Sequence, residues 1–477
     1  MTQPRITFIG AGSTVFARAL LRDLLAFPEL HECSISLMDI DETRLADSAA
    51  IAKAEVSRAG ARTSVTASTN RQRALEGSDY VFNMIQVGGF EPATVTDFEI
   101  PGQYGLRQTI GDTLGIGGIM RGLRTLPALV KIARDMEQLC PDALMMNYTN
   151  PMATLMWGLN QASAIRSVGL CHSVQGTAEE IAMYLDIPPD EISYTCAGIN
   201  HMAFYLSLYR NGNDLYPDLR ELLPSGNFPV YERVRFGLLR DFGFFVTESS
   251  EHFSEYVPWF IKSGRSDLID HYHIPLDEYP TRCVDQIADW ERTRSALLSE
   301  AASVYDVEPD RNRLSGSAER KLSRQEGVDQ KLAARLRRTL LEKRDRRANG
   351  HSGEYGSLII HSIETGQPRV IHGNVPNCGL ITNLPLDCCV EVPCLVDSHG
   401  VQPVHVGKIP DQLASLMHTN INVQRMTVEA SRTGSLDHVY QAAMLDPHTA
   451  AELSPDEIRS LVDDLISAHG DLIPALR

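Results

Sequence analysis

The feature that most constrains the fold is a glycine turn at the start of the chain. The run Ile6–Ile9 is short, apolar and β-prone, Gly10 and Gly12 follow it, and Ser13 stands where a leucine-rich amphipathic segment begins. A strand, a glycine turn and a helix N-terminus form the place where a Rossmann fold binds a dinucleotide pyrophosphate. The third glycine of the usual fingerprint is missing, because Val15 occupies that region.

An acidic residue supports the same interpretation. A second β-prone run, Ser34–Met38, ends directly before Asp39. An acid after the second strand of such a unit binds the ribose 2′-hydroxyl and favours NAD over NADP. The alternative is a Rossmann-like turn that binds no nucleotide, and the acid weighs against it. We therefore predict that Gly10, Gly12, Ser13 and Asp39 bind NAD.

The first 150 residues alternate between strand and helix patterns, which is typical of a doubly wound parallel sheet. A further glycine pair follows the fourth strand, and ligands bind such sheets at the carboxyl ends of the strands. Gly88 of this pair is therefore a further predicted cofactor contact, with a plain turn as the alternative. The later predicted strands are Thr63–Ala67, Tyr80–Ile85, Ala143–Met146 and, as the last, Arg166–Leu170, and the predicted helices are Thr14–Leu25, Glu42–Ala59, Thr125–Gln138 and Ala153–Ala162.

A second glycine-rich run, GDTLGIGGIMRGLRTLP, begins at Gly111 and holds five glycines. Glycine allows another backbone or a ligand to approach closely. We expect this run to precede the helix Thr125–Gln138 and to contact a ligand or another subunit.

Polar side chains follow two of the predicted strands. Asn150 ends the motif NYTNP, and Cys171 and His172 come directly after Arg166–Leu170. A second histidine, His201, ends the motif GINH. Thiolate and imidazole suit borderline divalent metals such as Mn²⁺, Fe²⁺ or Zn²⁺. The alternative is a core cysteine and a hydrogen-bonded histidine, and the position at the carboxyl edge of the sheet gives a metal site about equal weight, so both stay open.

Length and composition narrow the class of protein. The chain has 477 residues, so two domains are expected, and we divide it into residues 1–195 and 196–477. A net charge of −17 argues against a nucleic-acid partner. The sequence lacks an apolar run of about 18 residues and a signal peptide, so neither a membrane span nor secretion is expected. Nine scattered cysteines fit reduced thiols in the cytoplasm.

The second half gives coarser expectations. Phe204–Tyr209 alternates like a strand and Asn211–Asn213 like its hairpin turn, whereas residues 307–347 form a charge-dense helical segment that is solvated or contacts a subunit. A long helix, Met417–Leu445, carries Asn420 and Asn422 toward substrate, and residues 455–470 form a final amphipathic helix. Four cysteines lack zinc-site spacing and are predicted to be buried thiols: Cys378, Cys388, Cys389 and Cys394.

Together these motifs resemble glycoside hydrolase family four, the NAD-dependent glycosidases. The resemblance covers nearly the whole chain. It rests on GAGS, Asp39, QVGG, GDTxGxGGxxRxLR, NYTNP, CHSV, GINH, EHFSEYVPW, GNVPNxGxITNLP and VEVPCLVD. The motif CHSV is similar to that of the α-galactosidase subgroup. α-Glucosidase and α-glucuronidase activities of the same family stay open.

The resemblance implies a fold like that of lactate and malate dehydrogenases, a Rossmann domain followed by an α/β domain that caps the site and forms a homodimer or homotetramer. It also implies that Cys171 and His201 bind a divalent metal, commonly Mn²⁺, and that Asn150 contacts the sugar. Tyr256 matches the family's catalytic base. His172 stands where some members carry an acidic residue as general acid, which leaves the acid open.

The implied reaction on a small glycoside uses NAD catalytically. Carbon 3 of the sugar is oxidised, the metal acidifies the carbon 2 proton, and a base removes that proton as the aglycone leaves. Water then adds and the hydride returns. Two other classes remain possible, a 2-hydroxyacid dehydrogenase of the lactate/malate type and a silent NAD-binding sensor. Neither needs the Cys171/His201 pair.

Overall fold

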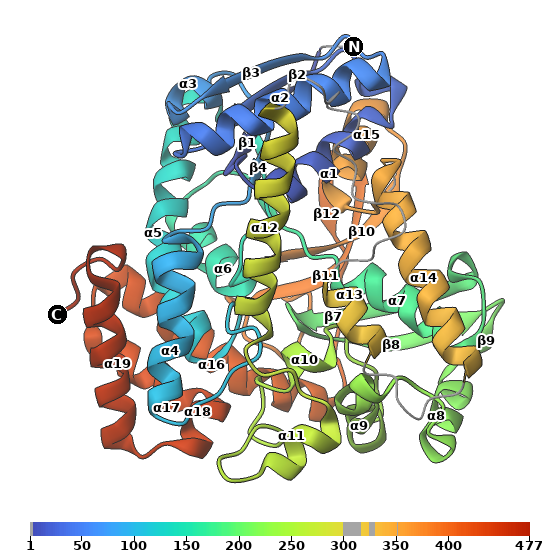
Figure 1. Ribbon diagram of the computed structural model, residues 1–477, viewed down its shortest axis with the longest axis vertical. Coiled ribbons are helices and arrows are strands. Elements are labelled where there is room, and N and C mark those ends of the chain that lie inside the picture. The colour runs from blue at the N-terminus through green and yellow to red at the C-terminus, as the bar shows by residue number, and fades with distance from the viewer. Residues whose placement is uncertain (1–2, 299–315, 324–329, 351) are drawn as a thin grey trace.

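The computed structural model describes residues 3–298, 316–323, 330–350 and 352–477, which are organised around one large mixed sheet (Figure 1). The described strands form a 12-stranded sheet in the order β3-β2-β1-β4-β5-β6-β10-β11-β7-β8-β9, with β12 paired to β11. Their bounds are β1 Arg5–Ile9, β2 Ser34–Met38, β3 Ser64–Ser68, β4 Tyr80–Asn83, β5 Leu144–Asn147, β6 Ser167–Gly169, β7 Ile192–Ile199, β8 Met202–Arg210, β9 Asn213–Asp214, β10 Arg369–Pro376, β11 Cys389–Asp397 and β12 Gly400–Pro403.

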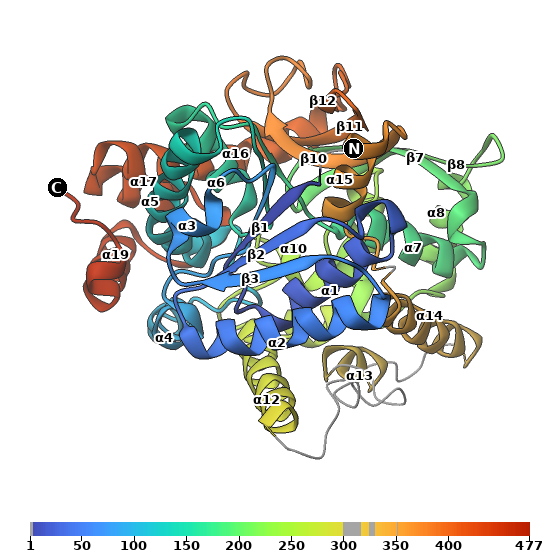
Figure 2. The ribbon, with the colours of Figure 1, turned by 90° about the horizontal axis from the view of Figure 1, so that it is seen from above.

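Strands β1 to β6 are parallel and the remaining pairings are antiparallel. The central parallel strands β1, β4 and β5 are short and largely buried, as in sheets covered on both faces, whereas the edge strand β3 is polar and mostly exposed. Figure 2 shows α1 and α2 on one side of the parallel strands and α5 and α6 on the other. The predicted doubly wound α/β sheet is therefore confirmed.

Helices surround the sheet along the whole chain (Figure 1). Their bounds are α1 Thr14–Leu25, α2 Glu42–Ala59, α3 Arg71–Leu75, α4 Val95–Gln103, α5 Gly115–Leu139, α6 Met152–Ala162, α7 Ser173–Leu185, α8 Tyr216–Ser225, α9 Arg233–Phe242, α10 Ser250–Phe253, α11 Ser266–Tyr272, α12 Glu278–Leu298, α13 Gly316–Ser323, α14 Gln330–Ala348, α15 Tyr355–Thr365, α16 Asp411–Thr433, α17 Leu436–Leu445, α18 Pro447–Glu452 and α19 Pro455–His469. The π-helical turn η2 spans Gly89–Thr94. Within the described residues, none of the helices is both long and apolar enough to span a membrane.

One expectation about the first half is wrong. Strand β6 is the last parallel strand, as predicted, and the antiparallel strand β10 continues the sheet beyond it. Four of the five glycines of the glycine-rich run lie inside α5, which begins at Gly115 rather than at Thr125. Its glycines allow close packing, because a Cβ on Gly117 would lie 2.3 Å from the Gly111 carbonyl oxygen. Helical burial thus outweighs the low helix propensity of glycine.

The structure of the second half confirms some of the predictions made from the sequence and contradicts others. The strand β8, its hairpin turn and the last helix α19 are confirmed. The long helix is broken, since Gly434 ends α16 in a left-handed conformation with φ +70°. Asn422 is exposed, and its orientation toward substrate stays a prediction, whereas Asn420 is buried and donates to the Tyr256 carbonyl oxygen at 3.2 Å.

Two more expectations concern cysteines and charge. Cys388, Cys389 and Cys394 are buried free thiols, as predicted, but Cys378 is exposed in a turn with φ +41°. The charge-dense segment is helical where the structure describes it, in α13 and α14, while residues 307–315 and 324–329 lie outside the described part of the chain.

Candidate functional site

The predicted cofactor turn is tightly folded between strands β1 and β2. Gly10 has φ +85°, and its N–H donates to the Met38 carbonyl oxygen at 2.9 Å. A Cβ on Gly10 would lie 2.8 Å from the Met84 backbone, so only glycine fits there. Helix α1 begins next to Ser13 without a side-chain cap, which leaves its first N–H groups available to an anion.

Asp39 lies directly beside this turn. Its Oδ2 atom accepts the Gly12 N–H at 2.7 Å, and a Cβ on Gly12 would meet the same oxygen. The acid predicted from the second strand therefore borders the turn predicted from the first. Gly88 has φ +80°, but a Cβ there would lie 2.4 Å from the Ala93 Cβ atom. Close packing of the loop is thus a sufficient reason for a glycine at position 88.

A possible metal site forms where three loops meet. Cys171 follows β6, His201 occupies the β7–β8 turn, and Glu248 follows a bridge of Val246 to β8. The Cys171 Sγ atom lies 3.5 Å from His201 Nε2, which lies 3.2 Å from Glu248 Oε2. All three donor atoms lie within 4.8 Å of one another, which suits a single divalent ion. The predicted pair is brought together, and Glu248, which no sequence motif singled out, joins it.

The pKa values of the two acidic groups in the cluster, the Cys171 thiol and the Glu248 carboxyl, are shifted in opposite directions. Burial raises the pKa of the Cys171 thiol, and the nearby Glu391 and Glu248 carboxylates raise it further. Burial would also raise the pKa of Glu248, but His252 and His201 outweigh it and lower that pKa to about 2. The protein alone therefore holds a carboxylate and a neutral thiol, and a bound cation favours the thiolate.

Tyr256 is tied directly to the cluster. Its hydroxyl oxygen lies 3.0 Å from His201 Nδ1, and the side chain is fully buried. Burial, together with Glu255, Glu248 and Asp112, raises the pKa of Tyr256 well above its ordinary value. His201 therefore has one ring nitrogen toward Tyr256 and the other toward the two remaining donors of the cluster.

The polar residues of the first half complete this region. Asn150 donates to Asp112 Oδ2 at 3.1 Å, and the Thr113 hydroxyl donates to Asp112 Oδ1 at 2.6 Å. Burial alone would raise the pKa of Asp112, but Arg121, His252 and His201 lower it. The aspartate of the glycine-rich run is thus an ionised acceptor near the cluster.

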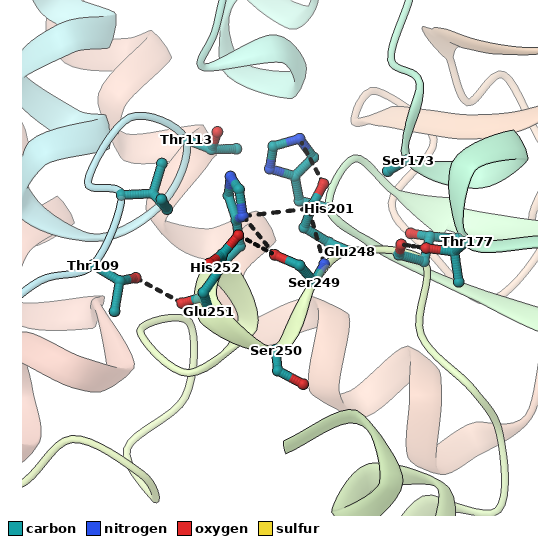
Figure 3. Close-up of polar contacts among 12 residues, drawn as sticks. Thr109, Thr113, Ser173, Thr177, His201, Glu248, Ser249, Ser250, Glu251 and His252 are labelled. Atoms are coloured by element: carbon teal, nitrogen blue, oxygen red, sulfur yellow. Dashed lines mark hydrogen bonds and ion pairs between the residues drawn. The ribbon is translucent and has the colours of Figure 1, made fainter. Parts of the chain in front are cut away.

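The loop that carries Asp112 is anchored from the second half of the chain. Glu255 accepts the backbone N–H groups of Thr109 at 2.7 Å, Ile110 at 3.2 Å and Gly111 at 2.8 Å. The Thr109 hydroxyl donates to the Glu251 carbonyl oxygen, as Figure 3 shows. The segment that contains Tyr256 therefore also fixes the position of Asp112.

The two histidines beside the cluster differ in burial. His172, the predicted general acid, is exposed next to Cys171 at the start of α7. His252 is largely buried, and its Nδ1 atom lies 2.9 Å from the Ser249 hydroxyl and 3.3 Å from Glu248 Oε1 (Figure 3). Its ring meets the His201 ring edge to face at 5.2 Å between centroids. The sequence motif EHFSEYVPW contains His252, but nothing in the motif alone distinguishes a role for this histidine.

Arg121 is a further residue that the sequence did not single out as functional. Its side chain is 6% exposed, and both terminal nitrogens lie 3.4 Å from the Tyr279 hydroxyl. No carboxylate forms an ion pair with it within the described ranges. The guanidinium also lies 5.5 Å from the centre of the Tyr279 ring and is near enough to Asp112 to lower the pKa of that carboxyl, so Arg121 is a candidate contact for a ligand bound beside Asp112.

Comparison with known protein families gives two matches. A family described as "Family 4 glycosyl hydrolase" matches residues 5–187, and "Family 4 glycosyl hydrolase C-terminal domain" matches residues 196–449. An alpha-galactosidase from Bacillus subtilis (strain 168) is 45% identical over 471 residues, which cover 98% of this chain and 99% of that protein. The family resemblance inferred from the motifs is confirmed.

Solved structures share the fold. A 6-phospho-alpha-glucosidase from gut microorganisms, in complex with NAD and Mn²⁺, superposes with a TM-score of 0.70 at 20% identity and covers 100% of both chains. A lactate dehydrogenase from Cryptosporidium parvum superposes with a TM-score of 0.51 at 12% identity, covering 91% of this chain and 99% of that one. The expected likeness to dehydrogenases is therefore present at the level of the fold.

Proposed function

The chain belongs to the family 4 glycosyl hydrolases, and from that membership we propose that it hydrolyses α-galactosides with NAD and a divalent metal ion, Mn²⁺ first among candidates, as cofactors. The observation that carries the proposal is the meeting of Cys171, His201 and Tyr256 beside a glycine turn of Rossmann type. A 2-hydroxyacid dehydrogenase, the main alternative, has no use for a Cys–His–Glu cluster.

The residues at both cofactor sites suit these groups. At the turn, the Cβ atoms that Gly10 and Gly12 lack would fill space beside Met84 and Asp39, so the backbone there is open only because both residues are glycine. The cluster offers a thiol, an imidazole nitrogen and a carboxylate, a mixed set that borderline divalent ions accept. We assign the turn, with Ser13 and Gly88, to NAD and Cys171 and His201 to the metal ion.

When bound, NAD would exchange a hydride with carbon 3 of the sugar, and the metal ion would act as a Lewis acid on the oxygens at carbons 2 and 3. Tyr256 is the proposed base for the carbon 2 proton. Nε2 of His201 faces the cluster, so a metal ion bound there would leave the ring hydrogen on Nδ1, which lies 3.0 Å from the Tyr256 oxygen and would donate to it. A donated hydrogen bond favours the phenolate form that a base requires, and so acts against the burial and the nearby carboxylates that raise the pKa of Tyr256.

Other residues orient the sugar and the leaving group. Asn150 and the ionised Asp112 offer an amide donor and carboxylate acceptors for sugar hydroxyl groups. We assign protonation of the leaving group to His172, because its exposed imidazole lies next to Cys171, where both solvent and a departing aglycone can reach it. His252, held by Ser249, is less accessible to a departing aglycone.

The test is hydrolysis of p-nitrophenyl α-galactoside with and without NAD, Mn²⁺ and a thiol reductant. We expect activity only when NAD and the metal ion are both present, and no net NADH. A panel of p-nitrophenyl α-glucoside, α-glucuronide and β-galactoside should give lower kcat/KM values. Full activity in exhaustively dialysed, EDTA-treated protein would disprove the cofactor requirement, and preference for another glycoside would reassign the substrate.

We also propose roles for the two domains, an oligomeric state and a cellular location for the protein. We assign NAD binding to residues 1–195, and substrate binding and subunit contacts mainly to residues 196–477. We propose a homodimer or homotetramer, which light scattering during size-exclusion chromatography would measure. A cytoplasmic location fits nine cysteines that form no disulfide among the described residues.

A further inference from the structure

We propose that Arg44 and Trp290 together form the platform on which the adenine ring of the dinucleotide stacks. The inference rests on the NAD site proposed above and adds two residues to it. One comes from the Rossmann half of the chain and the other from the C-terminal family domain. The cofactor site would then be complete only when both domains are in contact.

Helix α12 brings Trp290 to the cofactor turn. It starts at Glu278, beside the loop that carries Asp112, and packs against both η2 and α2. In Figure 1 this yellow helix crosses the molecule toward α2 at its upper end. It therefore extends from the loop of Asp112 near the proposed catalytic residues to the proposed adenosine end of the NAD site, a distance that a dinucleotide also has to span.

Arg44 links the turn to the tryptophan. It lies in the first turn of α2, and its Cβ atom would be 2.9 Å from a Cβ placed on Gly12. Its guanidinium carbon lies 4.3 Å from the centre of the Trp290 ring, which is a cation–π distance. Among the residues that the structure describes, the ion pair recorded for Arg44 is with Asp41 at 3.9 Å, so no closer carboxylate there turns Arg44 away from the glycine turn. The position next to Asp39 is where the adenosine ribose is expected.

Trp290 has an unsatisfied donor. Its Nε1 atom is buried, and no acceptor lies within hydrogen-bonding distance among the residues that the structure describes. A buried indole N–H ordinarily has a partner. Arg294 on the same helix also lies over the ring at 5.5 Å, which holds the indole in place. The ring nitrogens of adenine and the oxygens of its ribose are acceptors that could satisfy this N–H.

Adenine suits the platform by chemistry. Its flat π-system stacks on a guanidinium plane, and the guanidinium is itself supported by the indole. A lysine would keep the charge but would lose the planar surface. Stacking of this kind changes affinity by about fivefold to a hundredfold per base. The platform would recognise the adenosine half of NAD without contacting the nicotinamide.

The experiment is calorimetric titration with ADP-ribose, which carries the adenosine half, and with NADH. We expect Arg44→Ala, Arg44→Lys and Trp290→Ala each to weaken both ligands by about tenfold, and Trp290→Phe to recover part of the loss. The affinity for Mn²⁺ should stay at the wild-type value, because the metal cluster contains none of these residues. Trp259→Ala, which removes an exposed tryptophan stacked on Phe242, is the matched control.

Three results would overturn the platform. Unchanged ADP-ribose affinity in Trp290→Ala would mean that the helix contact serves only packing. Wild-type affinity in Arg44→Lys would mean that charge alone acts. Equal losses of ADP-ribose and Mn²⁺ affinity would indicate general loosening of the fold. If the wild-type protein binds NADH, these results would disprove the platform and leave the proposed glycosidase function standing. If the wild-type protein binds no NADH, both the platform and the proposed function are disproved.

Discussion

The glycine turn and the metal cluster, the two parts of the proposed cofactor site, are built from residues that are arranged in different ways along the sequence. At the turn, Gly10 and Gly12 are nearly consecutive and act through their backbone, and a single neighbouring strand supplies Asp39. At the catalytic end, Cys171, His201 and Glu248 come from three separate loops and act through their side chains. The first arrangement can be recognised in a short stretch of sequence, whereas the second exists only after the sheet has folded.

The two ends also differ in buried charge. The turn places one carboxylate against a backbone N–H. The catalytic end buries several ionisable groups, whose pKa values move in opposite directions, to about 2 for Glu248 and to about 7 for Glu391. A site of this kind can change protonation near neutral pH, which suits acid–base chemistry better than simple binding.

The largest expected effect comes from breaking the cluster itself. Cys171→Ser and His201→Ala should each abolish detectable metal binding and lower turnover by about a thousandfold or more, because each removes a strong donor from a small ligand set. The affinity for NADH should change little. Calorimetric titrations with Mn²⁺ and with NADH measure the affinities of the metal cluster and of the glycine turn on the same protein sample. Wild-type metal affinity in either variant would show that the ligands were assigned wrongly.

The next effect separates chemistry from binding. Tyr256→Phe keeps the ring and the packing but removes the proton acceptor, so the rate should fall by about 10²–10⁴-fold. Affinities for NAD and metal should remain near wild type. The wild-type enzyme should exchange the carbon 2 hydrogen of the product sugar with solvent deuterium, and the variant should do so far more slowly. An unchanged exchange rate in the variant would show that a residue other than Tyr256 is the base.

Glu248→Gln tests the residue that only the structure revealed. Whether this carboxylate binds the metal ion or orients His201, its loss should lower metal affinity by about 10- to 100-fold. NADH affinity should be unaffected. Glu191→Gln, which alters a carboxylate paired with Arg210 outside the site, is the control and should bind metal normally. Equal metal affinity in both variants would show that Glu248 does not contribute to metal binding.

The glycine turn can be broken without touching the cluster. Gly10→Ala forces a Cβ to within 2.8 Å of the Met84 backbone at φ +85°, so NADH affinity should fall by about tenfold or more. Mn²⁺ affinity should stay unchanged. Gly60→Ala is a matched control, because Gly60 also has positive φ, at +62°, but has nothing within 4 Å of the added Cβ. It should lose stability without losing NADH affinity.

The last effect concerns stability and the buried carboxyl of Glu391. Burial raises its pKa from 4.5 to about 7, so the folded protein keeps a proton that the unfolded chain releases in this range. The free energy of unfolding should therefore fall as pH rises from 4.5 to about 7, by on the order of 3 kcal/mol. Glu391→Gln should remove this contribution. Urea unfolding at several pH values measures it, and identical pH slopes in both proteins would contradict it.

Much of the fold could be predicted because its signals are local. Strand β2 and helices α1 and α2 begin and end at the predicted residues, since apolar periodicity and the cap at Asp41 act over a few positions. The start of α5 could not be predicted. Its glycines favour a loop by propensity, and only contacts with the Gly111 region make a helix favourable.

The sequence by itself determined the parallel sheet, the glycine turn with Asp39, and the family motifs that contain Cys171 and His201. The tertiary structure alone decided that Glu248 joins those two, that Glu255 anchors the loop of Asp112, and that α12 reaches α2. The physical reason is range. Strand and helix patterns arise from contacts within a few residues, whereas a ligand set depends on loops that meet in space, and no periodicity along the chain records such a meeting.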